Sequence, residues 1–154
     1  WLDPDGFDVT RLGKAPIETP RRAMGDLLGY GVRFGLTDDV MAAGEGIETM
    51  LSLRCALSDL PTVAALSAAH LAAIQFPNTL RRLYIARDDD EAGDTATTTL
   101  IDRAVGAGLE TIILSPVLGD FNEDLRSLGL DHLQAAVRVQ MAPQDVARFV
   151  ECSA

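Results

Sequence analysis

Short apolar runs alternate with helix-like segments along residues 39–114, and this alternation constrains the fold more than any other feature of the chain. Runs of this length are typical of buried strands, and each intervening segment is long enough for one helix. The alternation favours a mainly parallel α/β sheet with right-handed crossovers. The predicted elements are strands at 30–35, 39–43, 62–66, 82–87 and 110–114 and helices at 46–57, 68–75, 92–106, 122–129, 131–140 and 143–151.

The two ends of the chain differ from this core. Residues 1–6 contain a Pro-Asp-Gly sequence that predicts a turn, and residues 11–22 are predicted to be irregular. The first residue is Trp1, so we expect a processed chain or a piece of a longer protein. We divide the chain into an N-terminal flank (1–37), an α/β core (38–130) and a C-terminal helical extension (131–154).

Acidic residues stand where one of the apolar runs ends. Asp88, Asp89 and Asp90 follow the run 83–86 and precede the predicted helix at 92–106. Open α/β sheets bind ligands at the carboxyl ends of their strands. Because alternate residues of an extended chain share a face, Asp88 and Asp90 are expected to point together, and two carboxylates suit a hard cation such as Mg²⁺. The alternative is a solvated helix start, with Asp90 as N-cap.

Glu45 marks a second acidic junction of the same kind. The apolar run 40–43 ends at Gly44-Glu45-Gly46, and apolar residues with helical spacing follow from Ile47. Glycines on both sides of Glu45 let a backbone or a ligand approach closely. Taken alone, Glu45 would be an incidental acid in a surface turn. Two acidic strand–helix junctions in one sheet favour a site instead.

These junctions resemble the Toprim domain of primases and topoisomerases. The similar motifs are Gly44-Glu45-Gly46-Ile47-Glu48-Thr49 and Ala86-Arg87-Asp88-Asp89-Asp90-Glu91-Ala92-Gly93. Segments 61–69 and 119–125 are similar to a subgroup found in primase-helicase proteins of phages, plasmids and integrated elements. The resemblance covers about residues 1 to 128. It implies a Toprim-like, Rossmann-like fold, a mainly parallel sheet flanked by helices.

The resemblance also implies a set of site residues. It maps the glutamate of the family onto Glu45, as metal ligand or general base, and the Asp-x-Asp onto Asp88 and Asp90, as ligands of Mg²⁺ or of Mn²⁺. Asp120 is an auxiliary ligand candidate. Two positions depart from bacterial replicative primases. Thr49 stands where those enzymes usually have an aspartate, and their second Asp-x-Asp corresponds at best to Asp120 and Asn122. Asn122 has an alternative role as N-cap of the helix that follows.

Four arginines are candidates for binding substrate. Arg87 adjoins the acids and either contacts a phosphate or forms a salt bridge that relieves their mutual repulsion. Arg21, Arg22 and Arg33 are candidates for contacting template or nucleotide.

The charge of the chain bears on its partners. The net charge is −10, and residues 38–154 hold eighteen acidic but only eight basic residues. A freestanding DNA-binding domain is usually basic, because phosphate contacts dominate its affinity. We therefore expect a single-stranded DNA template and nucleoside triphosphates to bind through the full-length protein, with zinc-binding or helicase domains as neighbours.

The remaining composition describes a globular domain. Apolar residues make up 47% of the chain, and no apolar run is long enough to span a membrane, so we expect a cytoplasmic protein without membrane contact. Cys55 and Cys152 do not form a zinc site with His70 and His132, since the ligand spacing is absent. Cys55 is expected in the core.

Three functions are left open by the sequence. The first is the catalytic domain of a DNA primase or primase-helicase, performing magnesium-dependent nucleotidyl transfer in the replication of a mobile element. The second is a Toprim nuclease that cleaves DNA with the same acids. The third is a non-catalytic module whose acids are structural. A topoisomerase is disfavoured, because it needs a reactive tyrosine from another domain and Tyr84 is predicted to be buried.

Overall fold

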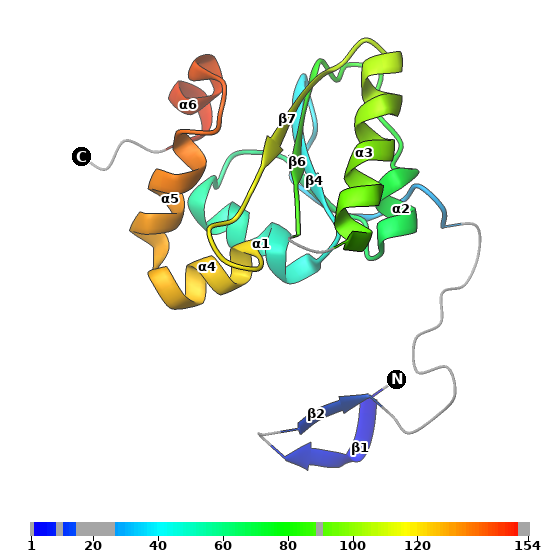
Figure 1. Ribbon diagram of the computed structural model, residues 1–154, viewed down its shortest axis with the longest axis vertical. Helices are drawn as coiled ribbons and strands as arrows, with labels where there is room; N and C mark the ends of the chain where they lie inside the picture. The colour runs from blue at the N-terminus through cyan, green and yellow to red at the C-terminus, as the bar shows by residue number, and fades with distance from the viewer. Residues whose placement is uncertain (1, 9–10, 15–26, 89–90, 151–154) are drawn as a thin grey trace.

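A five-stranded sheet forms the centre of the molecule (Figure 1). The computed structural model describes residues 2–8, 11–14, 27–88 and 91–150. The strand order is β3-β5-β4-β6-β7; β3 is antiparallel to its neighbour β5, and all other pairs are parallel. The predicted mainly parallel α/β sheet is therefore confirmed. The strands are β3 (Val32–Phe34), β4 (Val40–Gly44), β5 (Thr62–Ala64), β6 (Arg82–Ala86) and β7 (Glu110–Leu114).

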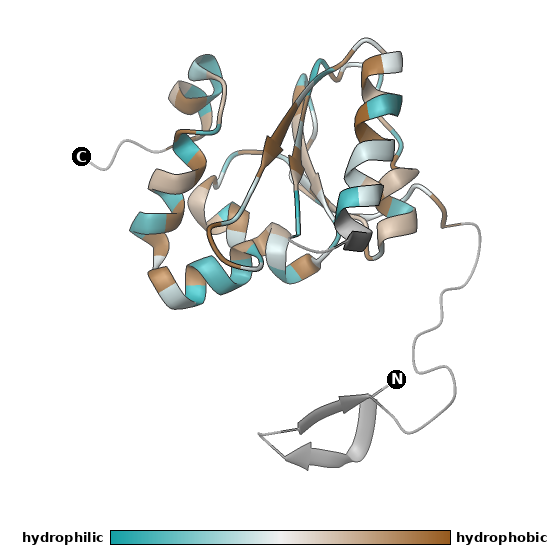
Figure 2. Ribbon diagram, in the orientation of Figure 1, coloured by the Kyte–Doolittle hydropathy of each residue, from teal (hydrophilic) through white to brown (hydrophobic). Residues whose placement is uncertain are grey.

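Helices cover both faces of this sheet (Figure 1). Side chains of β4 alternate between the two faces: Met41 and Ala43 pack towards α2 and α3, whereas Ala42 packs towards α1, α4, α5 and α6. Burial on both faces explains why β4 carries no charged residue, and in Figure 2 the helices around the sheet are of mixed colour. The helices are α1 (Ile47–Ala56), α2 (Ala68–Ala72), α3 (Glu91–Gly106), α4 (Phe121–Leu128), α5 (Leu130–Arg138) and α6 (Pro143–Phe149).

The N-terminal flank contains an element that the sequence analysis missed. Strands β1 (Leu2–Asp8) and β2 (Arg11–Lys14) pair antiparallel, so the predicted turn within residues 1–6 and the predicted irregular segment from residue 11 are both wrong over these strands. The register of the pair shifts between Leu2 and Phe7, across the Pro-Asp-Gly sequence. Such an irregularity, in a strand with a free edge, tolerates a proline that has no N–H to donate. Residues 15–22 lie outside the described ranges.

Two further expectations about helices need correction. Cys55 is exposed rather than in the core, because α1 turns Met50, Leu53 and Ala56 towards the sheet and leaves Cys55 on its outer side. Helix α2 ends at Ala72, three residues earlier than expected. Pro77 lies shortly beyond, and the residue before a proline disfavours the helical conformation. Within the described residues, the structure contains no helix that is both long and apolar enough to cross a membrane.

A glycine at the end of β4 allows the close packing there. A Cβ atom on Gly44 would lie 2.5 Å from Sδ of Met50, on α1, and 3.0 Å from Cβ of Ala86, at the end of β6. The absence of a side chain at Gly44 thus lets α1 and β6 approach the same point of β4. The course of the chain into Glu45 depends on this contact.

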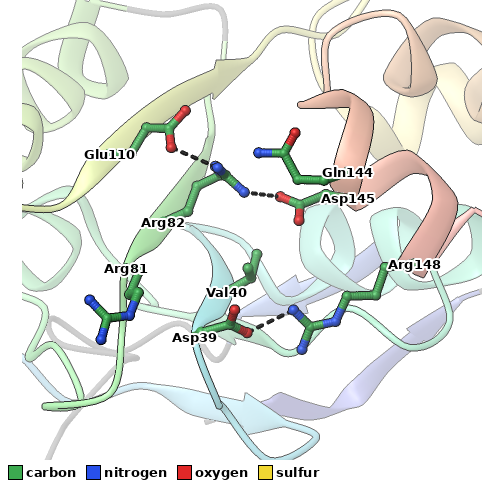
Figure 3. Close-up of a pocket in the computed structure, with 8 residues that line it drawn as sticks. All are labelled: Asp39, Val40, Arg81, Arg82, Glu110, Gln144, Asp145 and Arg148. Carbon is green, nitrogen blue, oxygen red and sulfur yellow. Dashed lines mark hydrogen bonds and ion pairs between the residues drawn. The ribbon is translucent and has the colours of Figure 1, made fainter.

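Helix α6 is joined to the sheet by a buried polar network (Figure 3). The hydroxyl of Tyr84, on β6, donates to Oδ2 of Asp145 at 2.7 Å and accepts from the backbone N–H of Ala142 at 3.1 Å. Arg82 donates to the same Asp145 oxygen at 2.8 Å and to Oε2 of Glu110 at 2.7 Å. Burial is the main cause that raises the pKa of Tyr84 well above its ordinary value, and the hydrogen bond to Asp145 is the second. Tyr84 is therefore favoured in its protonated form in the core.

The first prediction concerns this network. We expect Tyr84→Phe to lower the free energy of unfolding by about 1–3 kcal/mol, because Asp145 loses a donor and the Ala142 N–H loses its acceptor in a buried place. Urea denaturation measures the change. Tyr30→Phe is the matched control, since the Tyr30 side chain is exposed, and it should shift stability by less than about 0.5 kcal/mol. Equal effects of the two substitutions would contradict the account of the network.

The second prediction concerns the end of β4. We expect Gly44→Ala to destabilise the protein by about 1–3 kcal/mol, because the new methyl group overlaps Met50 and Ala86. Gly106→Ala is the control: no atom lies within 4 Å of a Cβ there, so alanine should be neutral or stabilise the helix by up to about 1 kcal/mol. Thermal melts of both variants test this, and an unchanged melting temperature for Gly44→Ala would show that the junction has room to spare.

Candidate metal site

Two of the predicted acidic residues follow neighbouring strands. Glu45 comes directly after β4 and Asp88 comes two residues after β6, and these strands pair in parallel with Ala43 opposite Ile85. Both acids therefore lie beyond the carboxyl ends of adjacent strands, and both are partly exposed. Asp90 lies outside the described residues. That all three carboxylates converge in space stays a prediction.

The helix after Glu45 begins without a side-chain cap. Gly46 is the N-cap of α1, with an extended backbone, and a Cβ atom there would lie 3.1 Å from Oγ1 of Thr49. Thr49 is the residue that stands where the resemblance leads one to expect an aspartate, and its side chain is 4% exposed. A carboxylate at this place would need a partner to offset the cost of its burial, whereas a threonine packs as a small residue.

Arg87 forms the salt bridge that the sequence analysis weighed for it. Its Nε lies 2.8 Å from Oδ1 of Asp94, in the first turn of α3. Its backbone N–H donates to the carbonyl of Leu114 and so extends the pairing of β6 with β7 by one residue. The guanidinium thus brings a positive charge to the junction that carries Asp88. Contact of Arg87 with a substrate phosphate stays a prediction.

Asp120 lies in the loop after β7 and is the N-cap of α4. Its side chain accepts from the backbone N–H of Glu123 at 2.7 Å, so the cap is two residues earlier than predicted and is not Asn122. Asn122 instead accepts from the hydroxyl of Ser52, on α1, at 3.5 Å. Because one carboxylate oxygen of Asp120 is occupied by the cap, metal binding by Asp120 would use the other oxygen or a water.

A buried carboxylate holds the loop in front of Asp120. Asp124 is 1% exposed and accepts from the backbone N–H groups of Val117 and Leu118, each at 2.8 Å. Two hydrogen bonds to a charged acceptor offset much of the cost of its burial. The sequence analysis gave Asp124 no such role, because an acid in the first turn of a helix looks the same whether it is solvated or bonded to a preceding loop.

Arg33 is the one further candidate arginine that lies within the described residues. Arg33, on β3, donates to the carbonyl of Gln75 at 3.2 Å and to Sδ of Met41 at 3.4 Å. Met41 lies in the first half of β4, well before its carboxyl end. Arg21 and Arg22 lie outside the described residues. A role of these three arginines in binding template or nucleotide stays a prediction.

A pocket of about 320 Å³ lies at the opposite edge of the sheet (Figure 3). The strands contribute their first residues to it, Val40, Arg82 and Glu110, so it is far along the sheet from the acidic junctions. Its charged groups are mostly paired with one another: Arg82 with Glu110 and Asp145, and Arg148 with Asp39 at 2.7 Å. The contact with Arg148 lowers the pKa of Asp39 below its ordinary value. This pocket contains the polar contacts that hold α6 in place.

The donor set at the acidic junctions fits a hard divalent cation. Glu45 and Asp88 offer carboxylate oxygens on residues that are each partly exposed, with Oδ1 of Asp88 buried, and Mg²⁺ prefers one or two carboxylates while it keeps several waters. Among residues 27–88 and 94–150, no group of three or more His, Cys, Asp or Glu side chains is arranged to hold a metal ion. The third predicted ligand, Asp90, falls between those ranges.

Three solved structures resemble the chain: the Aquifex aeolicus primase (zinc-binding and RNA polymerase domains; 22% identity, TM-score 0.49), a DNA primase domain from Pseudomonas aeruginosa (19%, 0.48) and the primase fragment of the bacteriophage T7 primase-helicase protein (17%, 0.48). They match 66%, 66% and 65% of this chain, which spans only 26%, 33% and 44% of theirs. No curated protein matches the sequence. Residues 40–131 match the profile of the Toprim domain. This match spans more than half of the chain, and the chain therefore belongs to the Toprim domain family.

Proposed function

We propose that this chain is the catalytic Toprim domain of a DNA primase or primase-helicase, and that it carries out magnesium-dependent nucleotidyl transfer in the replication of a mobile element. The observation that carries the proposal is the position of Glu45 and Asp88 beyond the carboxyl ends of the adjacent parallel strands β4 and β6. Toprim domains generally depend on a divalent metal. Ligands of open α/β sheets bind at this edge.

In this proposal Asp88 and Asp90 hold Mg²⁺, or Mn²⁺ in its place, with Glu45 as a further ligand or as the general base. Asp120, in the loop after the neighbouring strand β7, is an auxiliary ligand. A bound divalent ion neutralises the charge that develops on the transferred phosphoryl group. The carboxylates would set the position of the ion at the strand ends, since phosphoryl transfer needs positioning and charge neutralisation more than covalent chemistry from the protein.

Residues of this chain would also act as general base and contact a phosphate. The attacking group is a nucleotide 3′-hydroxyl and the leaving group is pyrophosphate. As general base, Glu45 would take the hydroxyl proton onto a carboxylate oxygen. Arg87, held by Asp94 at 2.8 Å, keeps a positive charge beside the acids and is available to a phosphate oxygen from a side chain that is 33% exposed.

Binding of the template is assigned to the whole protein rather than to this chain alone. Residues 38–154 carry eighteen acidic and eight basic residues, which repel a nucleic acid backbone. Zinc-binding or helicase domains, together with Arg21, Arg22 and Arg33, would supply the positive charge in a cytoplasmic replication protein. The proposal therefore expects the isolated chain to bind single-stranded DNA poorly at physiological salt.

The third prediction tests the proposal through Asp88. The full-length protein should incorporate nucleotides on a single-stranded DNA template in Mg²⁺, and Asp88→Asn should reduce the rate by roughly a hundredfold or more. Asp102→Asn is the matched control, because it removes the same charge from an exposed place near the other end of α3. Full activity of Asp88→Asn would contradict the proposal. Template cleavage without extension would favour a nuclease, and neither activity would favour a non-catalytic module.

Thermal melts test the role of Asp88 without an activity assay. Magnesium at about ten times its dissociation constant should stabilise the parent by about 1.4 kcal/mol and Asp88→Asn distinctly less. In chelator, Asp88→Asn should be as stable as the parent or more stable by about 1 kcal/mol, because one of several like charges is gone. Equal magnesium shifts in the parent and in Asp88→Asn would remove Asp88 from the metal site.

A further inference from the structure

The loop between β5 and α2 contains an unusual backbone conformation. Among the described residues other than glycine, Leu66 alone has a positive φ, of 74°. It lies in the segment 61–69, which the sequence analysis singled out and to which the proposed function assigns no role. A residue with a bulky side chain rarely adopts this left-handed conformation, and it does so only where surrounding contacts impose it.

Two hydrogen bonds to the end of β4 accompany this conformation. The N–H of Ala65 donates to the carbonyl of Gly44, and the N–H of Leu66 donates to the carbonyl of Glu45, each at 2.8 Å. In a regular strand, successive N–H groups point to opposite edges. The segments that follow β4 and β5 have therefore both departed from the regular hydrogen-bond pattern of the sheet, but they remain bonded to each other. The end of β4, and Glu45 with it, is tied to the loop after β5.

The left-handed conformation of Leu66 lets the chain keep the hydrogen bond to Glu45 and still turn into α2. Leu66 must keep its N–H on Glu45 and then lead into Ser67, which has an extended backbone and caps α2 by accepting from the N–H of His70 at 3.3 Å. Burial of the side chain does not explain the conformation, since Leu66 is 51% exposed. The turn therefore fixes the position of the peptide group that contains the Glu45 carbonyl.

We propose that Leu66 is a positioning residue for Glu45. Its left-handed backbone holds the Glu45 carbonyl and thereby sets the direction in which the Glu45 carboxylate leaves the end of β4. The inference rests on the proposed role of Glu45 in metal binding or proton transfer. It adds the loop after β5 to the site, although that loop supplies no ligand of its own.

The fourth prediction compares substitutions of Leu66 that differ in their tolerance of a positive φ. Asparagine adopts this conformation readily, whereas a β-branched valine resists it. In the full-length protein, Leu66→Val should weaken binding of Mn²⁺ about tenfold and Leu66→Asn no more than about twofold. Electron paramagnetic resonance of free Mn²⁺ measures the binding, and the signal of Glu45→Gln gives the contribution of other sites. Hydrogen exchange should show a protected amide at residue 66 in the parent and in Leu66→Asn, but not in Leu66→Val.

Leu36→Val is the matched control, because Leu36 is a loop leucine that is 95% exposed and lacks the positive φ. It should leave both readouts unchanged. Parental Mn²⁺ affinity in Leu66→Val, with its amide protection lost, would overturn the positioning role; so would equal weakening by valine and asparagine. If Leu66→Val does not fold, Leu66→Gly replaces it: it should keep the parental Mn²⁺ affinity within about twofold, because glycine adopts a positive φ without steric cost, and a tenfold loss would overturn the positioning role. If Glu45→Gln binds Mn²⁺ as the parent does, the role of Glu45 as a metal ligand is refuted, whatever the result for Leu66→Val.

Discussion

Strands β4 and β6 pair in parallel at the centre of the sheet, and both the core and the candidate site depend on this pairing. Their side chains fill the two apolar layers, one under α2 and α3 and the other under α1 and the C-terminal helices. The strands end side by side where Gly44 meets Ala86, in a contact with no room for another methyl group. Glu45 directly follows one of those ends, and Asp88 lies two residues beyond the other.

The two edges of the sheet use charge differently. At the amino edge, Arg82 and Tyr84 share the buried carboxylate of Asp145, and this neutralised cluster holds α6 against the strands. At the carboxyl edge, Glu45 and Asp88 remain partly exposed, with Arg87 bound to Asp94 beside them. The paired and buried charges hold α6 against the sheet, whereas the carboxyl ends of the strands are where open α/β sheets bind their ligands.

The sequence was sufficient for the elements of the core but not for all of their details. Strands β4 and β6 are mostly apolar because they are buried on both faces, and this signal is local. The N-cap of α4 was misplaced because Asp120 and Asn122 are both good capping residues, and the choice depends on which one meets the N–H of Glu123. The antiparallel pair β1–β2 was missed because Pro-Asp-Gly favours a turn in isolation.

Contacts between distant residues were beyond the reach of the sequence. The partners Tyr84 and Asp145 lie 61 positions apart, and no local pattern connects them. The positive φ of Leu66 has no signal in its residue type, since leucine is rarely found in that conformation. For the candidate site, the order of the strands accounts for the neighbouring positions of Glu45 and Asp88, and the convergence of their carboxylates stays a prediction.

An anomalous difference map from crystals of the protein soaked in Mn²⁺ tests the central claim most directly. The account predicts one strong peak at the carboxyl edge of the sheet, bound by a carboxylate oxygen of Asp88 and with the Glu45 carboxylate in its coordination shell, directly or through a water. Carboxylates of Glu45 and Asp88 that point to opposite faces of the sheet, or a peak only at the amino edge near Asp39 and Glu110, would contradict it.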